Sequence, residues 1–161
     1  MTRRMSCALL LLLAPALFAQ KKTDYIASSK AALSRQDYAK AEKDALAAVK
    51  AVPGSADAHR LLGTVYSVRN NFSAAITEFQ TAIRLNPNDA NAYYNLGVIY
   101  YKQNKFTDAL PNLNQAIKLN SKDAAFFDYR AMVYGKLGNS KAAEADRKSA
   151  ALLRTRTEAA R

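Results

Sequence analysis

The apolar residues of this chain recur with helical spacing, and the whole pattern repeats every 34 residues. Tyr66, Tyr100 and Tyr134 are separated by this interval. Further positions repeat in the same way: Ala75, Ala109 and Ala143; Ala82, Ala116 and Ala150; Leu85, Leu119 and Leu153. A fixed period of roughly 20–50 residues is typical of proteins that stack one small structural unit several times. We therefore expect four consecutive units, with the boundaries 22–55, 56–89, 90–123 and 124–157.

Each unit contains two amphipathic stretches separated by residues that favour turns. In the third unit, positions i, i+3, i+4 and i+7 of a first helix are occupied by Tyr93, Leu96, Gly97 and Tyr100. A second stripe with similar spacing consists of Ala109, Leu113, Ala116, Ile117 and Leu119. The two stripes of each unit are separated by Gln36-Asp37, Asn70-Asn71, Asn104-Lys105 and Gly138-Asn139. The pattern predicts an all-α chain of about eight antiparallel helices.

Polar residues precede the expected helix starts, and glycines lie where two helices are expected to pack closely. Ser55, Asp89 and Asp123 precede the first helices of the following units, where a side-chain oxygen can cap the helix. Gly63 and Gly97 lie on the packing face of the first helices, where they allow the second helix to approach closely.

The repeated residues resemble those of the tetratricopeptide repeat family. Its pattern W-x2-L-G-x2-Y, then A-x3-F, A and P, is matched in the second unit by His59, Leu62, Gly63, Tyr66, Ala75, Phe79, Ala82 and Pro87. The third unit matches with Tyr93, Leu96, Gly97, Tyr100, Ala109, Leu113 and Ala116, and Ser121 replaces the proline. The first unit keeps Tyr25, Ala41, Ala48 and Pro53 of this pattern. The fourth unit keeps Phe127, Tyr134, Ala143 and Ala150. The resemblance implies a right-handed superhelical solenoid over residues 22–157, followed by a tail at 158–161.

Residues 1–19 differ in character from the rest of the chain. Arg3 and Arg4 precede an uncharged run that includes the leucines 9–13, and Ala19 supplies a small residue before Gln20. This order is typical of a secretory signal peptide. The run is shorter than the roughly 20 residues of an ordinary membrane-spanning helix. We predict export to the periplasm or the medium after cleavage near Ala19/Gln20, with a retained anchor as the alternative.

The sequence offers few residues for catalysis or for metal binding. His59 is the only histidine and Cys7 the only cysteine, and Cys7 belongs to the predicted signal peptide. The chain has no glycine-rich phosphate loop, and its carboxylates are scattered over the helices. His59 occupies the repeat position that Tyr25, Tyr93 and Phe127 occupy in other units, which favours a packing role. We therefore expect a non-enzymatic protein without a cofactor.

The strongly basic composition and the family resemblance together suggest a binding surface. The formal net charge is +11, which favours an acidic partner. In the family, the first helices line a concave groove, and the same mapping places Leu33 and Ser34 in this groove. The predicted partner-binding residues are Lys30, Arg60, Thr64, Tyr94, Asn95, Val98, Tyr101, Lys102, Met132 and Lys136.

Three hypotheses for the function remain open at this point. The first is an adaptor of the cell envelope that holds a peptide segment of a partner protein in its groove. The second is a structural subunit of an envelope or secretion assembly that uses its convex or end surfaces. The third is a basic protein held at an anionic membrane surface through Arg147, Arg154 and Arg161, which share a helix face. Nucleic acid is not an expected partner because no recognition motif is present.

Overall fold

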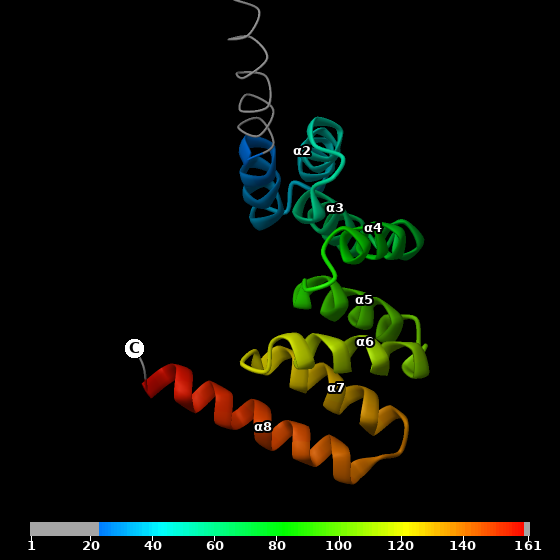
Figure 1. Cartoon of the computed structure of the whole chain (residues 1–161), viewed down its shortest axis with the longest axis vertical. Coiled ribbons are helices and arrows are strands. Elements are labelled where there is room, and N and C mark those ends of the chain that lie inside the picture. The colour runs from blue at the N-terminus through cyan, green and yellow to red at the C-terminus, as the bar shows by residue number, and fades with distance from the viewer. Residues whose placement is uncertain (1–22, 160–161) are drawn as a thin grey trace, which may run out of the picture.

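The computed structural model describes residues 23–159, and every regular element within them is a helix. A helical segment at 23–34 comes first. It is followed by α2 (Tyr38–Ala51), α3 (Ala56–Val68), α4 (Phe72–Leu85), α5 (Ala90–Lys102), α6 (Phe106–Leu119), α7 (Ala124–Lys136) and α8 (Ser140–Ala159) (Figure 1). The predicted all-α solenoid of four helix-turn-helix repeats is confirmed. The predicted signal peptide, residues 1–19, lies outside the described residues.

Successive helices form antiparallel hairpins that stack on one another. The most extensive contacts lie within the pairs α3–α4, α5–α6 and α7–α8. Neighbouring hairpins then meet through α2–α3, α4–α5 and α6–α7. The first helices of successive repeats also contact each other, α3 with α5 and α5 with α7. Side chains from neighbouring first helices can therefore contribute to one continuous surface.

The turn inside each hairpin has the same backbone conformation in every repeat. The φ angle is 60° at Gln36, Asn70 and Asn104, and 77° at Gly138. These four positions are 34 residues apart and belong to the turn pairs predicted from the sequence. Asparagine and glycine tolerate this left-handed region better than most residues. The turns therefore end each first helix at the same point of the repeat.

The predicted helix caps are present at the starts of three first helices. The Ser55 hydroxyl accepts a hydrogen bond from the Ala58 amide at 3.3 Å. Asp89 accepts from the backbone of α5, and Asp123 accepts from that of α7. Each side chain satisfies an amide that the helix itself leaves without an acceptor.

Two glycines bring the helices of the inner hairpins into close contact. A Cβ atom built on Gly63 would lie 2.8 Å from Cε1 of Phe79. A Cβ atom on Gly97 would lie 2.8 Å from Cγ of Leu113. Phe79 and Leu113 are fully buried, so neither side chain can move away at little cost. The close approach predicted from the sequence is confirmed.

The outer repeats have polar pairs at the repeat position of Leu62 and Leu96, which is occupied by Ser28 and Arg130. Arg130 stands where the inner repeats have Leu62 and Leu96, and its guanidinium forms two 2.7 Å hydrogen bonds with Asp146. These bonds raise the pKa of Arg130 above its usual value. In the first repeat, Asp44 accepts hydrogen bonds from Ser28 at 2.6 Å and from Lys40 at 2.8 Å. The terminal units thus use fewer apolar side chains, as a repeat stack requires at its ends.

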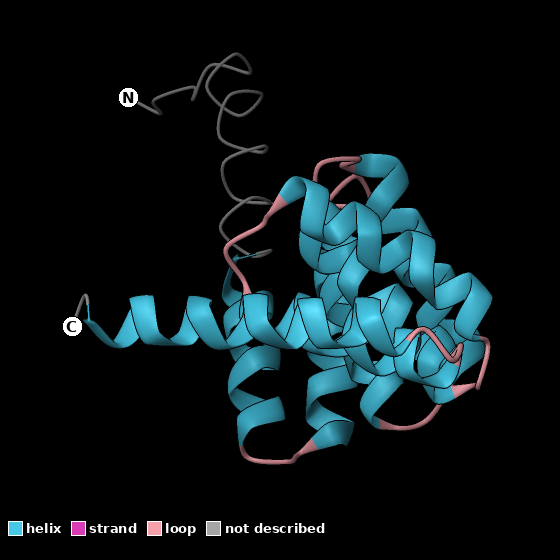
Figure 2. Ribbon diagram, turned by 90° about the horizontal axis from the view of Figure 1, so that it is seen from below, coloured by secondary structure: helices cyan, strands magenta, loops and turns pink. Residues whose placement is uncertain are grey.

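The last helix is longer than its counterparts in the other repeats. α8 has 20 residues, whereas α4 and α6 each have 14. Figure 2 shows its C-terminal end projecting beyond the stack. Glu158 and Ala159, in the predicted tail, continue this helix. No helix within the described residues combines the length and apolar character needed to cross a bilayer.

Candidate functional site

The predicted binding residues all lie on the first helices of the repeats. Lys30 is on the segment 23–34, Arg60 and Thr64 are on α3, and the remaining ones are on α5 and α7. We call the surface formed by these predicted side chains the first-helix face. The structure divides it into two parts of different character.

The N-terminal part of this face contains a hollow of about 270 Å³ between segment 23–34 and α3. We call it the N-terminal hollow, and it is lined by Ile26, Lys30, Leu33, Asp57, Arg60, Leu61 and Thr64. Three predicted binding residues, Lys30, Arg60 and Thr64, converge here from two repeats. Ile26 was not predicted, although it occupies the same repeat position as Arg60 and the 34-residue frame could have identified it.

The two cations of the N-terminal hollow differ in what they contact. The Arg60 Nε donates to Asp89 at 2.8 Å, and its Nη2 donates to Asp57 at 3.0 Å. Arg60 therefore connects α3 to the residue that caps α5, and its charge is balanced by two carboxylates. Lys30 is exposed and forms no ion pair within residues 23–159. Lys30, rather than Arg60, is thus the cation available to a ligand.

The C-terminal part of the face is filled by an aromatic cluster. The ring of Tyr94 stacks on Phe126 with a centroid distance of 4.8 Å and meets Tyr129 edge-on at 5.5 Å. Tyr101 contacts Tyr129 at 6.0 Å and Phe106 at 5.6 Å. Burial raises the pKa of Tyr94 to about 12. Tyr94 and Tyr101 therefore pack the third repeat against the fourth, in addition to any role in binding.

The other predicted residues of this part remain at the surface to different degrees. Asn95 and Val98 are half-buried, and the Met132 side chain is 37% exposed. Lys102 and Lys136 are exposed. The Lys102 ammonium lies 5.9 Å from the centre of the Phe72 ring. None of these side chains lines any of the three hollows described in this section.

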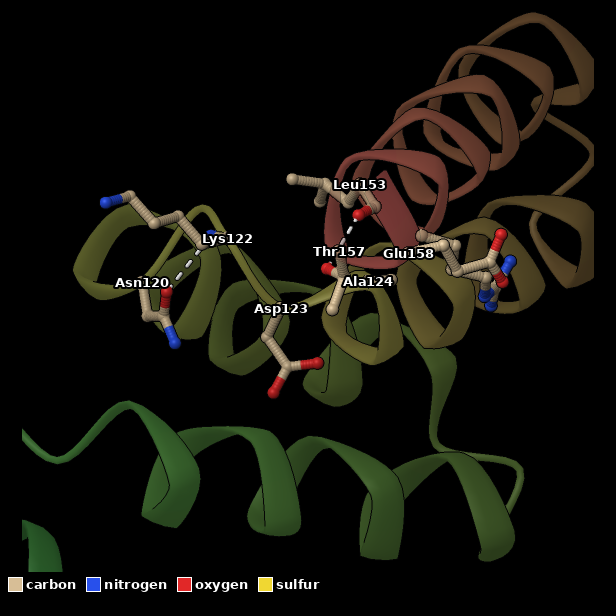
Figure 3. A pocket seen from close by; sticks show the side chains of 8 residues that line it. Asn120, Lys122, Asp123, Ala124, Leu153, Thr157 and Glu158 are labelled. Atoms are coloured by element: carbon tan, nitrogen blue, oxygen red, sulfur yellow. Dashed lines mark hydrogen bonds between the residues drawn. The ribbon is translucent and has the colours of Figure 1, made fainter. Parts of the chain in front are cut away.

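A larger hollow of about 430 Å³ lies at the other end of the molecule (Figure 3). It is lined by Asn120, Lys122, Asp123, Ala124, Leu153, Arg154, Thr157 and Glu158. Several of its polar groups already have partners, since Asp123 caps α7, Arg154 pairs with Asp128, and Thr157 donates to its own helix. Its charges are of both signs, and two of its eight lining residues, Ala124 and Leu153, are apolar.

A third hollow, of about 300 Å³, is also polar and already internally paired. It is lined by Glu42, Tyr66, Arg69 and Asn71. Arg69 forms an ion pair with Glu42, and Asn71 caps α4. Of these three hollows, the N-terminal one has the most apolar lining residues, Ile26, Leu33 and Leu61, and they lie beside Lys30, which is unpaired within the described residues.

The lone histidine has structural contacts. The Nδ1 of His59 lies 2.6 Å from a carboxylate oxygen of Glu78, and its Nε2 lies 2.9 Å from the carbonyl oxygen of Pro53. The Glu78 contact joins α3 to α4 within one repeat, and the Pro53 contact joins α3 to the turn that precedes it. Within residues 23–159, no three His, Cys, Asp or Glu side chains are grouped so that they could hold a metal ion.

Comparison with known families identifies the repeats. A TPR repeat model matches residues 69–104, and two tetratricopeptide repeat models match residues 90–123 and 26–67. No curated protein sequence matches this chain.

Solved structures share the fold at low sequence identity. MamA is 22% identical with a TM-score of 0.76, over 85% of this chain and 80% of MamA. The pilF protein of Pseudomonas aeruginosa is 22% identical with a TM-score of 0.79, over 84% of this chain and 62% of pilF. YrrB, described as a TPR protein with an unusual peptide-binding site, is 21% identical with a TM-score of 0.69, over 82% of this chain and 68% of YrrB.

The matched models describe a repeat and not a catalytic domain. Together the three models match residues 26–67 and 69–123, and helical hairpins continue to residue 159. The chain therefore belongs to the tetratricopeptide repeat family, whose members are in general non-catalytic modules for binding other proteins.

Proposed function

We propose that this protein-interaction module binds an extended segment of a partner protein along its first-helix face. The observation that carries the proposal is the N-terminal hollow, in which three predicted binding residues from two repeats surround an apolar floor. A hollow of this kind is what a binding site for a partner side chain requires. The peptide-binding site named for YrrB, which has the same fold, supports the proposal by analogy.

The charges of the first helices favour an acidic partner. Lys30, Lys102 and Lys136 are exposed and have no ion pair within the described residues. The acidic residues Asp57 and Asp128 are each paired with an arginine. The charges left for a ligand are therefore positive, and they are distributed along the whole face.

The proposed setting is the cell envelope, where the chain would act as an adaptor. The support for this setting is the order of residues 1–19, with two arginines, an apolar run and a small residue before Gln20. Detection of the protein in the periplasmic or extracellular fraction, with Gln20 at its N-terminus, tests the location and the cleavage together.

Site-specific photo-crosslinking in cells tests the binding surface. A photoreactive residue at Ser34, exposed beside the N-terminal hollow, should crosslink one defined partner, which mass spectrometry then identifies. The same residue at Leu46, 44% exposed on α2, is the matched control. Introducing Lys30→Glu into the Ser34 variant should abolish the crosslink. An equal yield from Leu46 contradicts binding on the first-helix face, whereas a yield unaffected by Lys30→Glu contradicts only the contribution of Lys30 to it.

A structural subunit of a larger assembly is the second candidate. Large apolar side chains outside the first-helix face favour it, with Leu85 41% and Leu152 54% exposed. Under this hypothesis, crosslinks form from these positions and are insensitive to Lys30→Glu. The charge-based membrane hypothesis has less support, because Arg154 of the arginine stripe is paired with Asp128 and Arg161 lies outside the described residues.

A further inference from the structure

We infer that the N-terminal hollow is the anchor subsite of the first-helix face, and that it receives one apolar side chain flanked by a carboxylate that binds Lys30. This inference rests on the proposed function and makes it specific. It assigns the main contribution to binding to the first two repeats and not to the aromatic residues of the third.

The floor of the hollow is apolar and comes from two helices. Ile26 and Leu33 belong to segment 23–34, and Leu61 belongs to α3. Leu61 is only 5% exposed and packs in the core cluster that Ile26 and Leu33 border, so the floor is held in place by the fold. A preformed apolar floor spares the ordering cost that a flexible site would add to binding.

The size of the hollow limits what it can hold. Its volume of about 270 Å³ is slightly below the roughly 300–1,000 Å³ typical of sites for whole small molecules. It therefore suits a single side chain of a longer segment, of the size of leucine, methionine or phenylalanine. Burial of such a side chain contributes more to binding than surface contacts do.

Lys30 stands where it can bind a carboxylate beside this side chain. It lies one helical turn after Ile26 and one turn before Leu33, so the three share one face of the helix. Its ammonium has no ion pair in residues 23–159, whereas Arg60 is bound to both Asp57 and Asp89. A carboxylate next to the apolar anchor would pair with Lys30 and leave the Arg60 connection to α5 intact.

The other surfaces described above differ from the N-terminal hollow in their lining. On the first-helix face of the third and fourth repeats, Tyr94 is stacked on Phe126. Two of the eight residues that line the hollow at the end of α8 are apolar, and its Asp123 and Arg154 already have partners. Three of the seven residues that line the N-terminal hollow are apolar, and Lys30 beside them has no ion pair within residues 23–159.

Selection from a library of random displayed peptides tests the inference. With the purified protein as target, the enriched peptides should share one large apolar residue within two positions of an Asp or Glu. A synthetic copy of the most enriched peptide, measured by fluorescence anisotropy, should bind the Lys30→Glu variant about tenfold or more weakly, the change expected for loss of one charged contact. Repeating the selection on Lys30→Glu should enrich peptides with Lys or Arg beside the apolar residue.

Lys141→Glu on α8 is the matched control, because it makes the same charge change at an exposed position far from the hollow along the chain. It should leave the affinity unchanged, and circular dichroism should show that both variants are folded. Enriched peptides without an acidic residue, or with equal affinity for Lys30→Glu, overturn the inference while groove binding stands. Enrichment of no peptide by the unmodified protein overturns the proposed function itself.

Discussion

Adding one methyl group at Gly97 should destabilise the protein, whereas the same change at Gly135 should stabilise it. Both glycines are inside first helices, at α5 and α7, so Gly→Ala gains about 0.5–1 kcal/mol of helix propensity at each. No atom lies within 4 Å of a Cβ built on Gly135. At Gly97 the new Cβ would lie 2.8 Å from Leu113 Cγ and 3.3 Å from the Ala109 carbonyl oxygen.

The magnitude follows from this geometry. Leu113 is fully buried and cannot turn away, so the helices must separate or the side chain must leave its preferred rotamer. Such overpacking typically costs about 1–3 kcal/mol. After the gain in helix propensity, Gly97→Ala should lower the free energy of unfolding by up to about 2.5 kcal/mol, and Gly135→Ala should raise it by about 0.5–1 kcal/mol.

Urea unfolding followed by circular dichroism at the helical band measures both values. The Gly97→Ala/Leu113→Ala double variant checks the cause, because removing the Leu113 branch should make the alanine at position 97 neutral or favourable. The coupling energy between the two sites should be about 1–3 kcal/mol. If Gly97→Ala is as stable as Gly135→Ala, or if its effect persists without the Leu113 side chain, then close helix packing at Gly97 is not the reason for the glycine.

Three further predictions concern polar groups in the stack. Asp146→Ala should lower the free energy of unfolding by about 2–4 kcal/mol, because it leaves the mostly buried Arg130 guanidinium without its paired carboxylate; urea unfolding measures this. The hydrogen bond from Lys40 holds the pKa of Asp44 below its usual value. The stability that the ionised Asp44 contributes should therefore be present above about pH 4 and lost as the pH falls further. Acid unfolding of the Asp44→Asn variant should lack this pH-dependent loss of stability. Gln103→Leu should raise the thermal unfolding temperature, since the buried Oε1 of Gln103 has no hydrogen-bond partner and its removal saves about 1 kcal/mol.

The order of helices and turns could be predicted from the sequence, because it depends on local interactions that recur every 34 residues. The left-handed turn residues Asn70 and Asn104 and the caps Ser55 and Asp89 act within a few residues of their own position. Even the close helix approach at Gly97 could be predicted, since its contact with Leu113 is formed inside one hairpin. A periodic sequence therefore determines the hairpin and its repetition.

Whether a predicted binding residue is free to contact a ligand could not be predicted from the sequence. Arg60 was predicted as a donor to a ligand, but its Nε is bound to Asp89, 29 residues further along the chain. Tyr94 was predicted to line the groove, but it stacks on Phe126 of the next repeat. Both contacts join one repeat to its neighbour, so they depend on how the hairpins stack and not on the pattern within either hairpin.

The sequence by itself determined the all-α fold of four repeats, the turns inside the hairpins and the caps Ser55, Asp89 and Asp123. Only the tertiary structure decided that Arg60 is ion-paired while Lys30 has no ion pair within residues 23–159, and that a hollow with apolar lining opens between segment 23–34 and α3. The physical reason is the distance along the chain over which each interaction acts. Helix formation, capping and turn formation depend on neighbours a few residues away, whereas the pairing and burial of a long side chain depend on the angle at which separate hairpins meet.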